Sequence, residues 1–258
     1  MLNVRAERYI EGDIDPFVVG LHRLLLSQSE DNGQRFMEEL FSKIEHYGLS
    51  CSFRRDDVPE ELKRAFRKTY FARFNKEAYQ RLRADFNCGG RSDFSLLYLL
   101  IIYGFNHMIR FNANGEFNLP VGNVDFNRNV FQALLGYFET VREREIDWHT
   151  TDFREFLDRI EPGKNDFLYL DPPYLITFSE YNKLWSEKEE QDLTKALDLL
   201  DSKGGIFGIS NVTHYKGRIN RHFLEWSSKY TTHEIISNYI SYHDNTQKRP
   251  REVFVTNY

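Results

Sequence analysis

The pattern of apolar and polar residues along the chain divides it into two α/β stretches separated by a helical one. The first stretch predicts a short strand at Arg8-Tyr9-Ile10, an acidic turn from Glu11 to Pro16, and an apolar helix from Phe17 to about Leu26. A polar, turn-rich break follows at residues 27–33. The strand and helix of this stretch begin an alternation that resumes only after residue 129.

The middle of the chain reads as mostly helical. A helical pattern runs from residue 34 to about Phe86, and its apolar stripe includes Phe36, Leu40 and Ile44. A loop and then a continuously apolar segment, about Phe94 to Tyr103, predict a buried helix. Asn114-Gly115 between two aromatic-bearing runs predicts a β-hairpin.

From residue 130 onward, short apolar runs alternate with helical periods joined by short links. The predicted elements are a helix at 130–144, a strand at 146–148, a helix at 154–160, a strand at 167–170, a helix at 186–200, a strand at 206–211, a helix around 222–229 and a strand at 252–257. Such alternation predicts an α/β fold with a mostly parallel sheet. We therefore expect a first part of the α/β domain at residues 1–28, an inserted helical domain at 29–129 and the rest of the α/β domain at 130–258.

The most specific signal is Asp171-Pro172-Pro173-Tyr174, directly after the predicted buried strand Phe167–Leu170. Two consecutive prolines end the strand and fix the backbone, because each locks φ and lacks an N–H donor. The resulting loop lies at the carboxyl end of a strand, where α/β sheets bind ligands. A carboxylate, rigid carbonyls and an aromatic face together fit a planar base with an amino group. The alternative is that Pro-Pro merely ends a strand and Asp171 begins a turn.

The composition argues against a membrane-spanning, a disulfide-rich or a metal-binding protein. Of 258 residues, 41% are hydrophobic and 28% charged, which is ordinary for a globular protein. The longest apolar stretch, Leu96 to Phe105, is too short to cross a bilayer, so we expect no membrane association. Two cysteines and scattered histidines predict no disulfide framework and no metal, which favours a reducing cytoplasm.

Charge is unevenly distributed along the chain. The net charge is −5, yet Cys51 to Arg91 contains eleven Lys or Arg against six Asp or Glu, a local net charge of +5. A basic segment on an acidic body fits a module that follows phosphates. A solvated helix surface of mixed charge is the equally weighted alternative.

With these residues placed, the chain resembles a Dam-type DNA adenine-N6 methyltransferase of the D12 class over almost its whole length. The resemblance rests on residues 3–16, 104–112, 118–122, 171–177, 181–186 and 210–212. It implies a Rossmann-like S-adenosylmethionine-dependent methyltransferase sheet with an inserted target-recognition domain that carries a β-hairpin. It also implies transfer of a methyl group from S-adenosylmethionine to N6 of an adenine flipped out of double-stranded DNA, often within GATC. We expect a monomer.

The resemblance assigns roles at the catalytic loop and around the cofactor. Asp171 and the carbonyl of Pro172 would accept the two amine hydrogens, on a loop made rigid by Pro173, while Tyr174 would stack on the flipped base. Asp13, on a loop after the first strand, would hold the ribose hydroxyls of the cofactor, and Asp152, Phe153 and Asp171 would also contact the cofactor. The alternatives are an ordinary turn residue for Asp13 and a helix N-cap for Asp152.

The inserted domain carries the residues that resemble DNA contacts. Arg110 matches an arginine that reads a guanine edge, for which a bidentate guanidinium is well suited. Asn106 and Met108 match residues that enter the duplex or touch a thymine methyl, and Pro120 matches a hairpin contact. A buried helix end with a structural arginine is the alternative. Asn123-Val124 stands where the family commonly has a basic residue.

A larger departure lies at the start, where the family has a strand ending in a Gly-rich turn that wraps the cofactor. The glycine pairs Gly89-Gly90 and Gly204-Gly205 follow helical segments and do not replace it. We therefore expect an N-terminally incomplete catalytic domain. A catalytically impaired DNA-binding remnant or split-enzyme half is one alternative; an enzyme acting on RNA or on a protein glutamine is another.

Overall fold

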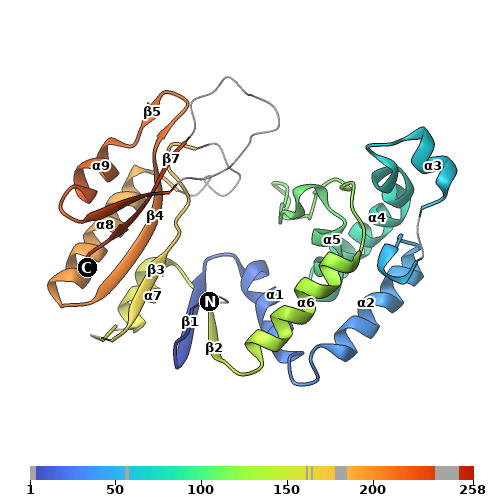
Figure 1. Cartoon of the computed structure of the whole chain (residues 1–258), viewed down its shortest axis with the longest axis horizontal. Helices are drawn as coiled ribbons and strands as arrows, with labels where there is room; N and C mark the ends of the chain where they lie inside the picture. The colour runs from blue at the N-terminus through green and yellow to red at the C-terminus, as the bar shows by residue number, and fades with distance from the viewer. Residues whose placement is uncertain (1–3, 56–57, 161, 164, 178–184, 236–249) are drawn as a thin grey trace. The chain divides into compact units, whose positions relative to one another are not determined.

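The computed structural model describes residues 4–55, 58–160, 162–163, 165–177, 185–235 and 250–258 (Figure 1). Contacts divide the chain into two compact units, Met1–Thr151 and Asp152–Tyr258. The α/β class expected from the sequence is confirmed, because both units contain helices together with parallel or mixed strands. The three-part division at residues 28 and 129 stays a prediction.

The first unit is mostly helical. In chain order it contains β1 (Arg8–Asp13), α1 (Pro16–Ser27), α2 (Gln34–Tyr47), the 3₁₀ turn η1 (Ser52–Arg54), α3 (Glu60–Ala65), α4 (Tyr70–Cys88), α5 (Phe94–Ile102), the 3₁₀ turn η2 (Phe105–His107), α6 (Arg128–Val141) and β2 (Glu145–Thr150). Helix α5 is buried, as its continuous apolar sequence predicts, and Leu97, Leu99 and Leu100 are each 0% exposed. Asp93 caps this helix by accepting hydrogen bonds from the backbone N–H groups of Ser95 and Leu96.

Strands β1 and β2 pair in parallel, in a register that places Asp13 opposite Thr150. The expectation that Asp13 lies on a loop after the first strand is wrong, because β1 extends through the acidic segment to Asp13 itself. The strand continues because β2 pairs with it along its whole length, from Arg8 to Asp13. Asp13 is therefore the last residue of a parallel strand.

The predicted hairpin is present. An isolated bridge between Phe111 and Phe117 closes its tight turn, and a second bridge, between Gly104 and Val121, lies at its base. Asn112 closes the turn by accepting from the N–H of Gly115, which has a φ of 73°. At the base of the hairpin the backbones approach closely: a Cβ on Gly122 would lie 2.6 Å from the carbonyl oxygen of Gly104.

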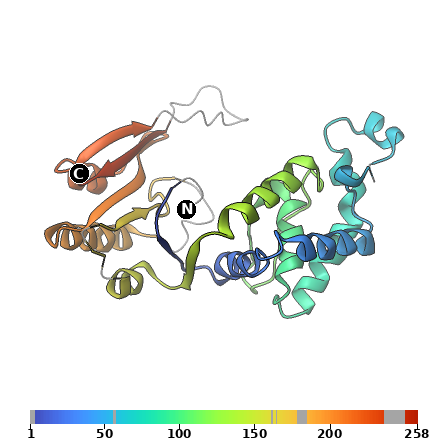
Figure 2. The ribbon, with the colours of Figure 1, turned by 60° about the horizontal axis from the view of Figure 1, so that its bottom comes forward.

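The second unit holds one sheet and the helices that pack on it (Figures 1 and 2). Its elements are α7 (Phe153–Ile160), β3 (Phe167–Leu170), α8 (Glu187–Ser202), β4 (Ile206–Tyr215), β5 (Arg218–Ile219), α9 (Arg221–Ser227), β6 (Thr231–Ile235) and β7 (Arg251–Thr256). The strand order is β3-β4-β7-β6, with β5 paired to β4. Side chains from all three helices join one apolar cluster with β3, β4 and β7.

Two expectations for this sheet are wrong. The sheet of the second unit is not mostly parallel: β3 pairs in parallel with β4, but β7 runs antiparallel to both β4 and β6. Strand β3 is also buried on one face alone, since Leu168 is 8% exposed whereas Phe167 and Tyr169 are 47% and 56% exposed. Neighbouring strand residues point to opposite faces, and the helices pack on the face that carries Leu168.

A buried carboxylate links α8, β4 and α9. Glu190 is 1% exposed, and its Oε1 accepts hydrogen bonds from the side-chain amides of Asn211, at 3.2 Å, and Asn220, at 2.8 Å. Asn220 also caps α9 by accepting from the N–H of Phe223. Oε2 of Glu190 has no hydrogen-bond partner in the described part of the chain. Burial raises the pKa of this carboxyl, and the two amide hydrogen bonds only partly oppose that effect.

Two glycines give a matched test of the packing at the hairpin base. Gly122→Ala should lower the free energy of unfolding by about 1–3 kcal/mol, because its methyl group meets the backbone of Gly104. Gly136→Ala, in α6 with nothing within 4 Å of its Cβ position, should raise it by about 0.5–1 kcal/mol. Urea denaturation of both variants measures the two signs, and equal effects would contradict the close approach.

The buried Glu190 predicts a pH-dependent stability. Because its folded-state pKa is raised, the folded state loses stability as the pH rises above the unfolded-state value of about 4.3. Glu190→Gln keeps the acceptor oxygen without the charge, so it should gain on the order of 1 kcal/mol at pH 7.5 and almost nothing at pH 4. Denaturation at both pH values measures this, with exposed Glu225→Gln as the control. A variant destabilised equally at both values would contradict the assignment.

Candidate functional site

The loop Asp171-Pro172-Pro173-Tyr174 leaves the carboxyl end of β3, as the sequence predicts. The register of β3 on β4 pairs Leu170 with Ile209, so Asp171 begins where the strand pairing ends. The side chain of Asp171 is exposed, while Pro172, Pro173 and Tyr174 are half-buried. Thr177 closes the loop by donating its backbone N–H, at 3.0 Å, and its hydroxyl, at 2.9 Å, to the carbonyl of Tyr174.

The hydroxyl of Tyr174 lies between two carboxylates. Its Oη is 3.0 Å from Oδ1 of Asp171 and 3.2 Å from Oε1 of Glu252, on β7. Burial, and then the negative charge of Asp171 and Glu252, raise the pKa of this phenol well above its usual value. Tyr174 therefore keeps its proton and acts as a donor throughout the physiological pH range.

This arrangement can hold an amino-bearing aromatic ring. An exposed carboxylate accepts N–H groups, and the backbone carbonyl of Pro172 belongs to a segment whose φ angles are fixed by proline. Beside them stands an aromatic ring whose hydroxyl end is anchored. The chemistry that this arrangement supports best is the positioning of an amine by hydrogen bonds.

Asp152 and Phe153 lie at the start of α7, on the second unit. Asp152 Oδ1 accepts from the backbone N–H of Arg154 at 2.9 Å, which is the helix-capping role that the sequence offered as an alternative. Arg154 also donates to Asp152 through its guanidinium and to Asp192 on α8 at 2.7 Å. The ring of Phe153 lies 4.4 Å from the guanidinium carbon of Arg154 and 5.7 Å from the ring of Trp185.

Asp13 lies in the first unit, at the carboxyl end of β1. Its Oδ1 accepts from the N–H of Asp15 at 2.7 Å, and Asp15 in turn caps α1 by accepting from Phe17. The backbone carbonyl of Asp13 accepts from the N–H of Thr151 at 3.0 Å. Burial raises the pKa of Asp13 above its usual value. A strand-end carboxylate next to the end of a parallel partner fits the predicted ribose contact.

All four predicted DNA contacts lie in the hairpin segment between Gly104 and Val121. Asn106 belongs to η2, where it and His107 have φ values of 56° and 54°. The N–H of Phe105 donates to the carbonyl of the exposed Pro120 at 2.9 Å, which ties η2 to the hairpin. Two successive left-handed residues are unusual outside glycine, and such backbone strain concentrates at functional segments.

Arg110 is already engaged within the hairpin. Its Nε donates to Oδ1 of Asn118 at 2.9 Å, and its Nη2 donates to the carbonyl of Asn118 at 2.8 Å. These bonds use two of the five N–H donors of a guanidinium. The structural role offered as the alternative is therefore present, and a guanine contact would use the remaining donors. Met108, the fourth residue, is half-buried and packs on the core of the first unit.

The basic side chains of residues 51–91 fall into two groups, one hydrogen-bonded within the first unit and one exposed. Arg81, Arg83 and Arg91 donate to backbone carbonyls of Tyr47, Leu119 and Gly115, so they hold the first unit together. A second group of basic side chains is exposed on α3, the following turn and the start of α4. It comprises Arg64, Arg67, Lys68, Arg73 and Lys76.

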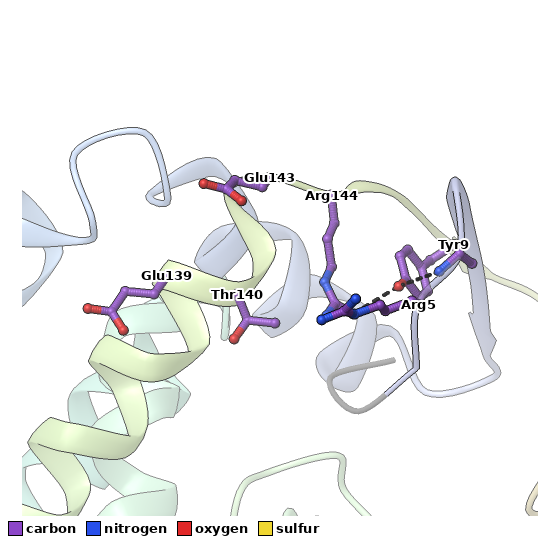
Figure 3. A pocket seen from close by; sticks show the side chains of 7 residues that line it. Arg5, Tyr9, Glu139, Thr140, Glu143 and Arg144 are labelled. Carbon is purple, nitrogen blue, oxygen red and sulfur yellow. Dashed lines mark hydrogen bonds between the residues drawn. The ribbon is translucent and has the colours of Figure 1, made fainter.

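A shallow pocket of about 440 Å³ lies elsewhere in the first unit (Figure 3). It is lined by residues of the segment before β1, β1 itself and the end of α6, and none of them is a predicted site residue. Arg144 donates to the hydroxyl of Tyr9 at 3.0 Å and lies over its ring, so its charge serves internal packing.

Within the described residues, no group of three His, Cys, Asp or Glu side chains could hold a metal ion. None of the helices in the described ranges has the length and apolar character needed to span a bilayer. Asn3 and Tyr181 to Leu184, which carry part of the resemblance, lie outside the described residues.

Three residues of the site were not singled out from the sequence. Arg154 follows Asp152-Phe153 directly, and its spacing from Asp192 and Glu189 gave no signal. Trp185 lies just before a predicted helix, where an aromatic residue reads as core. Glu252 lies in a terminal strand, and the pairing of β7 with β4 brings it to the loop after β3.

The sequence profile of the D12 class N6 adenine-specific DNA methyltransferases matches residues 1–240. The Type II methyltransferase M.FokI of Planomicrobium okeanokoites is 34% identical over 266 residues, which cover 100% of this chain and 37% of that protein. The modification methylase StsI of Streptococcus sanguinis is 30% identical over 268 residues, again 100% of this chain and 37% of the relative. The retron Ec67 DNA adenine methylase of Escherichia coli is 29% identical over 143 residues, 53% of this chain and 49% of that protein.

The chain thus spans little more than a third of the length of its first two relatives. The family profile and both of these relatives extend across Asp171–Tyr174 and the hairpin segment alike. This chain belongs to the D12 class of N6 adenine-specific DNA methyltransferases.

Proposed function

We propose that this chain transfers a methyl group from S-adenosylmethionine to N6 of an adenine flipped out of double-stranded DNA. The observation that carries the proposal is the loop after β3, where the exposed Asp171 stands beside the anchored ring of Tyr174. The amine of adenine is a poor nucleophile, because its lone pair is delocalised into the ring. Hydrogen bonds from the amine to Asp171 and to the carbonyl of Pro172 localise that lone pair and aim it at the methyl group.

Tyr174 contributes through its ring. A base outside the duplex loses its stacking partners, at a cost of a few kcal/mol, and an aromatic face restores part of that loss. The loop closure at Thr177 and the fixed φ of Pro172 and Pro173 hold the ring in place before the base arrives. Positioning of this kind needs neither a metal ion nor a covalent intermediate.

The residues present fit the cofactor. Trp185 has a buried indole N–H without a hydrogen-bond partner in the described part of the chain, next to the ring of Phe153. The adenine ring of the cofactor has an aromatic face that would pack on Phe153 and nitrogen atoms that would accept from the indole N–H of Trp185. Asp152, Phe153 and Asp171 of the second unit would hold the cofactor, which would supply an activated methyl group on a sulfonium sulfur. Asp13 of the first unit stays a separate predicted contact.

Residues 29–129 form the target-recognition part of this proposal, with Asn106, Met108, Arg110 and Pro120 as contacts to bases. The exposed basic group on α3 and α4 would contact phosphates. From Leu62 to Lys76 the sequence has six Lys or Arg and no Asp or Glu. Exposed Phe66 and Phe74, each 37% accessible, lie among them. We place the protein in the cytoplasm with its DNA, and we propose GATC as the first sequence to test.

Removal of the acceptor carboxylate tests the catalytic assignment. Asp171→Ala should lower the transfer rate by about 100-fold or more, because the amine loses its principal hydrogen-bond acceptor. The measurement is mass spectrometry of N6-methyladenine in unmethylated genomic DNA and in GATC-bearing duplexes. Exposed Asp158→Ala on α7 is the matched control and should keep full activity. Equal activity of the two variants would refute the role, and a folded wild-type chain that binds duplex without transfer would support the remnant alternative.

The salt dependence of duplex binding tests the basic group. Each phosphate that a cationic side chain neutralises contributes about 0.9 to the slope of log K against log[salt]. Arg67→Ala, Lys68→Ala and Lys76→Ala should each lower the slope by about that amount, whatever the DNA sequence. Lys195→Ala, exposed on α8, should leave the slope unchanged. Fluorescence anisotropy at several salt concentrations measures the slope for each variant. Identical slopes for the three variants and the control would show that these side chains do not contact phosphates.

A further inference from the structure

We infer that Glu252 is a positioning residue of the methyl-transfer site, which takes over the hydroxyl of Tyr174 when an amine occupies Asp171. The inference rests on the proposed function, since it concerns the same site. Glu252 lies eighty-one residues after Asp171 in the sequence and is half-buried. No feature of the catalytic motif itself points to it.

The sheet brings Glu252 to the loop. Strand β4 lies between β3 and β7: it pairs in parallel with β3 and antiparallel with β7. The register on the β7 side sets Glu252 opposite Val212, three residues beyond Ile209, which is the partner of Leu170. Glu252 therefore lies at the same end of the sheet as Asp171, with one strand between them. Tyr174 spans that strand, and its hydroxyl touches both carboxylates.

A phenol has one proton for these two acceptors. Because the pKa of Tyr174 is raised, the proton stays on the phenol, and its hydrogen bond goes to Asp171 or to Glu252. A carboxylate that accepts from the phenol is a weaker acceptor for a further N–H, since part of its charge is already compensated. Glu252 removes this competition by accepting the hydroxyl while Asp171 accepts the amine.

The surroundings of Glu252 favour this role over an ordinary ion pair. Arg251, its neighbour along β7, pairs with Glu234 on β6 through Nε at 3.2 Å. Successive residues of a strand point to opposite faces, so this arginine is directed away from the side chain of Glu252. Glu252 thus faces the hydroxyl of Tyr174 as an acceptor.

A double-mutant cycle tests the inference. Glu252→Gln should lower kcat about tenfold in the wild-type background and leave KM for S-adenosylmethionine unchanged. A neutral amide oxygen is a weaker acceptor than a carboxylate, so the hydroxyl then stays on Asp171. In the Tyr174→Phe background, Glu252→Gln should change kcat less than twofold, since no hydroxyl remains to be held. Glu225→Gln, an exposed glutamate on α9, is the control in both backgrounds. A loss from Glu252→Gln that is equal in the two backgrounds overturns the inference.

A second readout separates this inference from the proposed function. In protein labelled with 3-fluorotyrosine, the ¹⁹F resonance of Tyr174 is the one that disappears in Tyr174→Phe. It should move in Glu252→Gln and stay in place in Glu225→Gln. A shifted resonance in a chain that transfers no methyl group supports the contact and refutes the proposed function. A resonance that does not move overturns the inference, whatever the rate of transfer.

Discussion

The pairing of β4 with two neighbours of opposite direction determines the chemistry of the second unit. Its parallel partner, β3, places Asp171 where the strand ends, and its antiparallel partner, β7, places Glu252 at the same end of the sheet. Consecutive prolines convert the end of β3 into a loop with little backbone freedom. The ring of Tyr174 then spans β4 and closes the arrangement through one hydroxyl. A change in either register would separate these groups.

The sequence predicted those parts of the site whose conformation depends on residues close together in the chain. Pro172-Pro173 after an apolar run marks a strand end, and the structure has the strand at Phe167–Leu170. Helix α8 likewise lies where the sequence predicts a helix, and a capping box at Ser186 begins it. The extension of β1 to Asp13 was missed, because its acidic residues join the strand only through pairing with β2. For the same reason the contact of Glu252 with Tyr174 could not be predicted, since it depends on a long-range register.

Arg110 has a structural role in the hairpin and also keeps the donors that the predicted guanine contact would need. Its hydrogen bonds to Asn118 fix the hairpin, and they leave three guanidinium donors for another partner. Asn87 acts similarly from α4, because its side-chain amide donates to the carbonyl of Phe117 and accepts from its N–H. A recognition surface held in this way loses little conformational entropy when it binds. Structural use of such polar residues therefore supports a role in reading bases.

The carboxylates of the site suit an uncharged amine, whereas the exposed basic side chains suit the charged backbone of a nucleic acid. Asp171 and Glu252 place two carboxylates around one phenol, an environment that disfavours a phosphate and favours an amine donor. The exposed basic side chains of α3 and α4 have the opposite preference. In the proposed reaction the base, which carries no negative charge, would meet the carboxylates, and phosphates would meet the cationic side chains. The proposed base flipping, which would expose N6, would also separate these two chemistries.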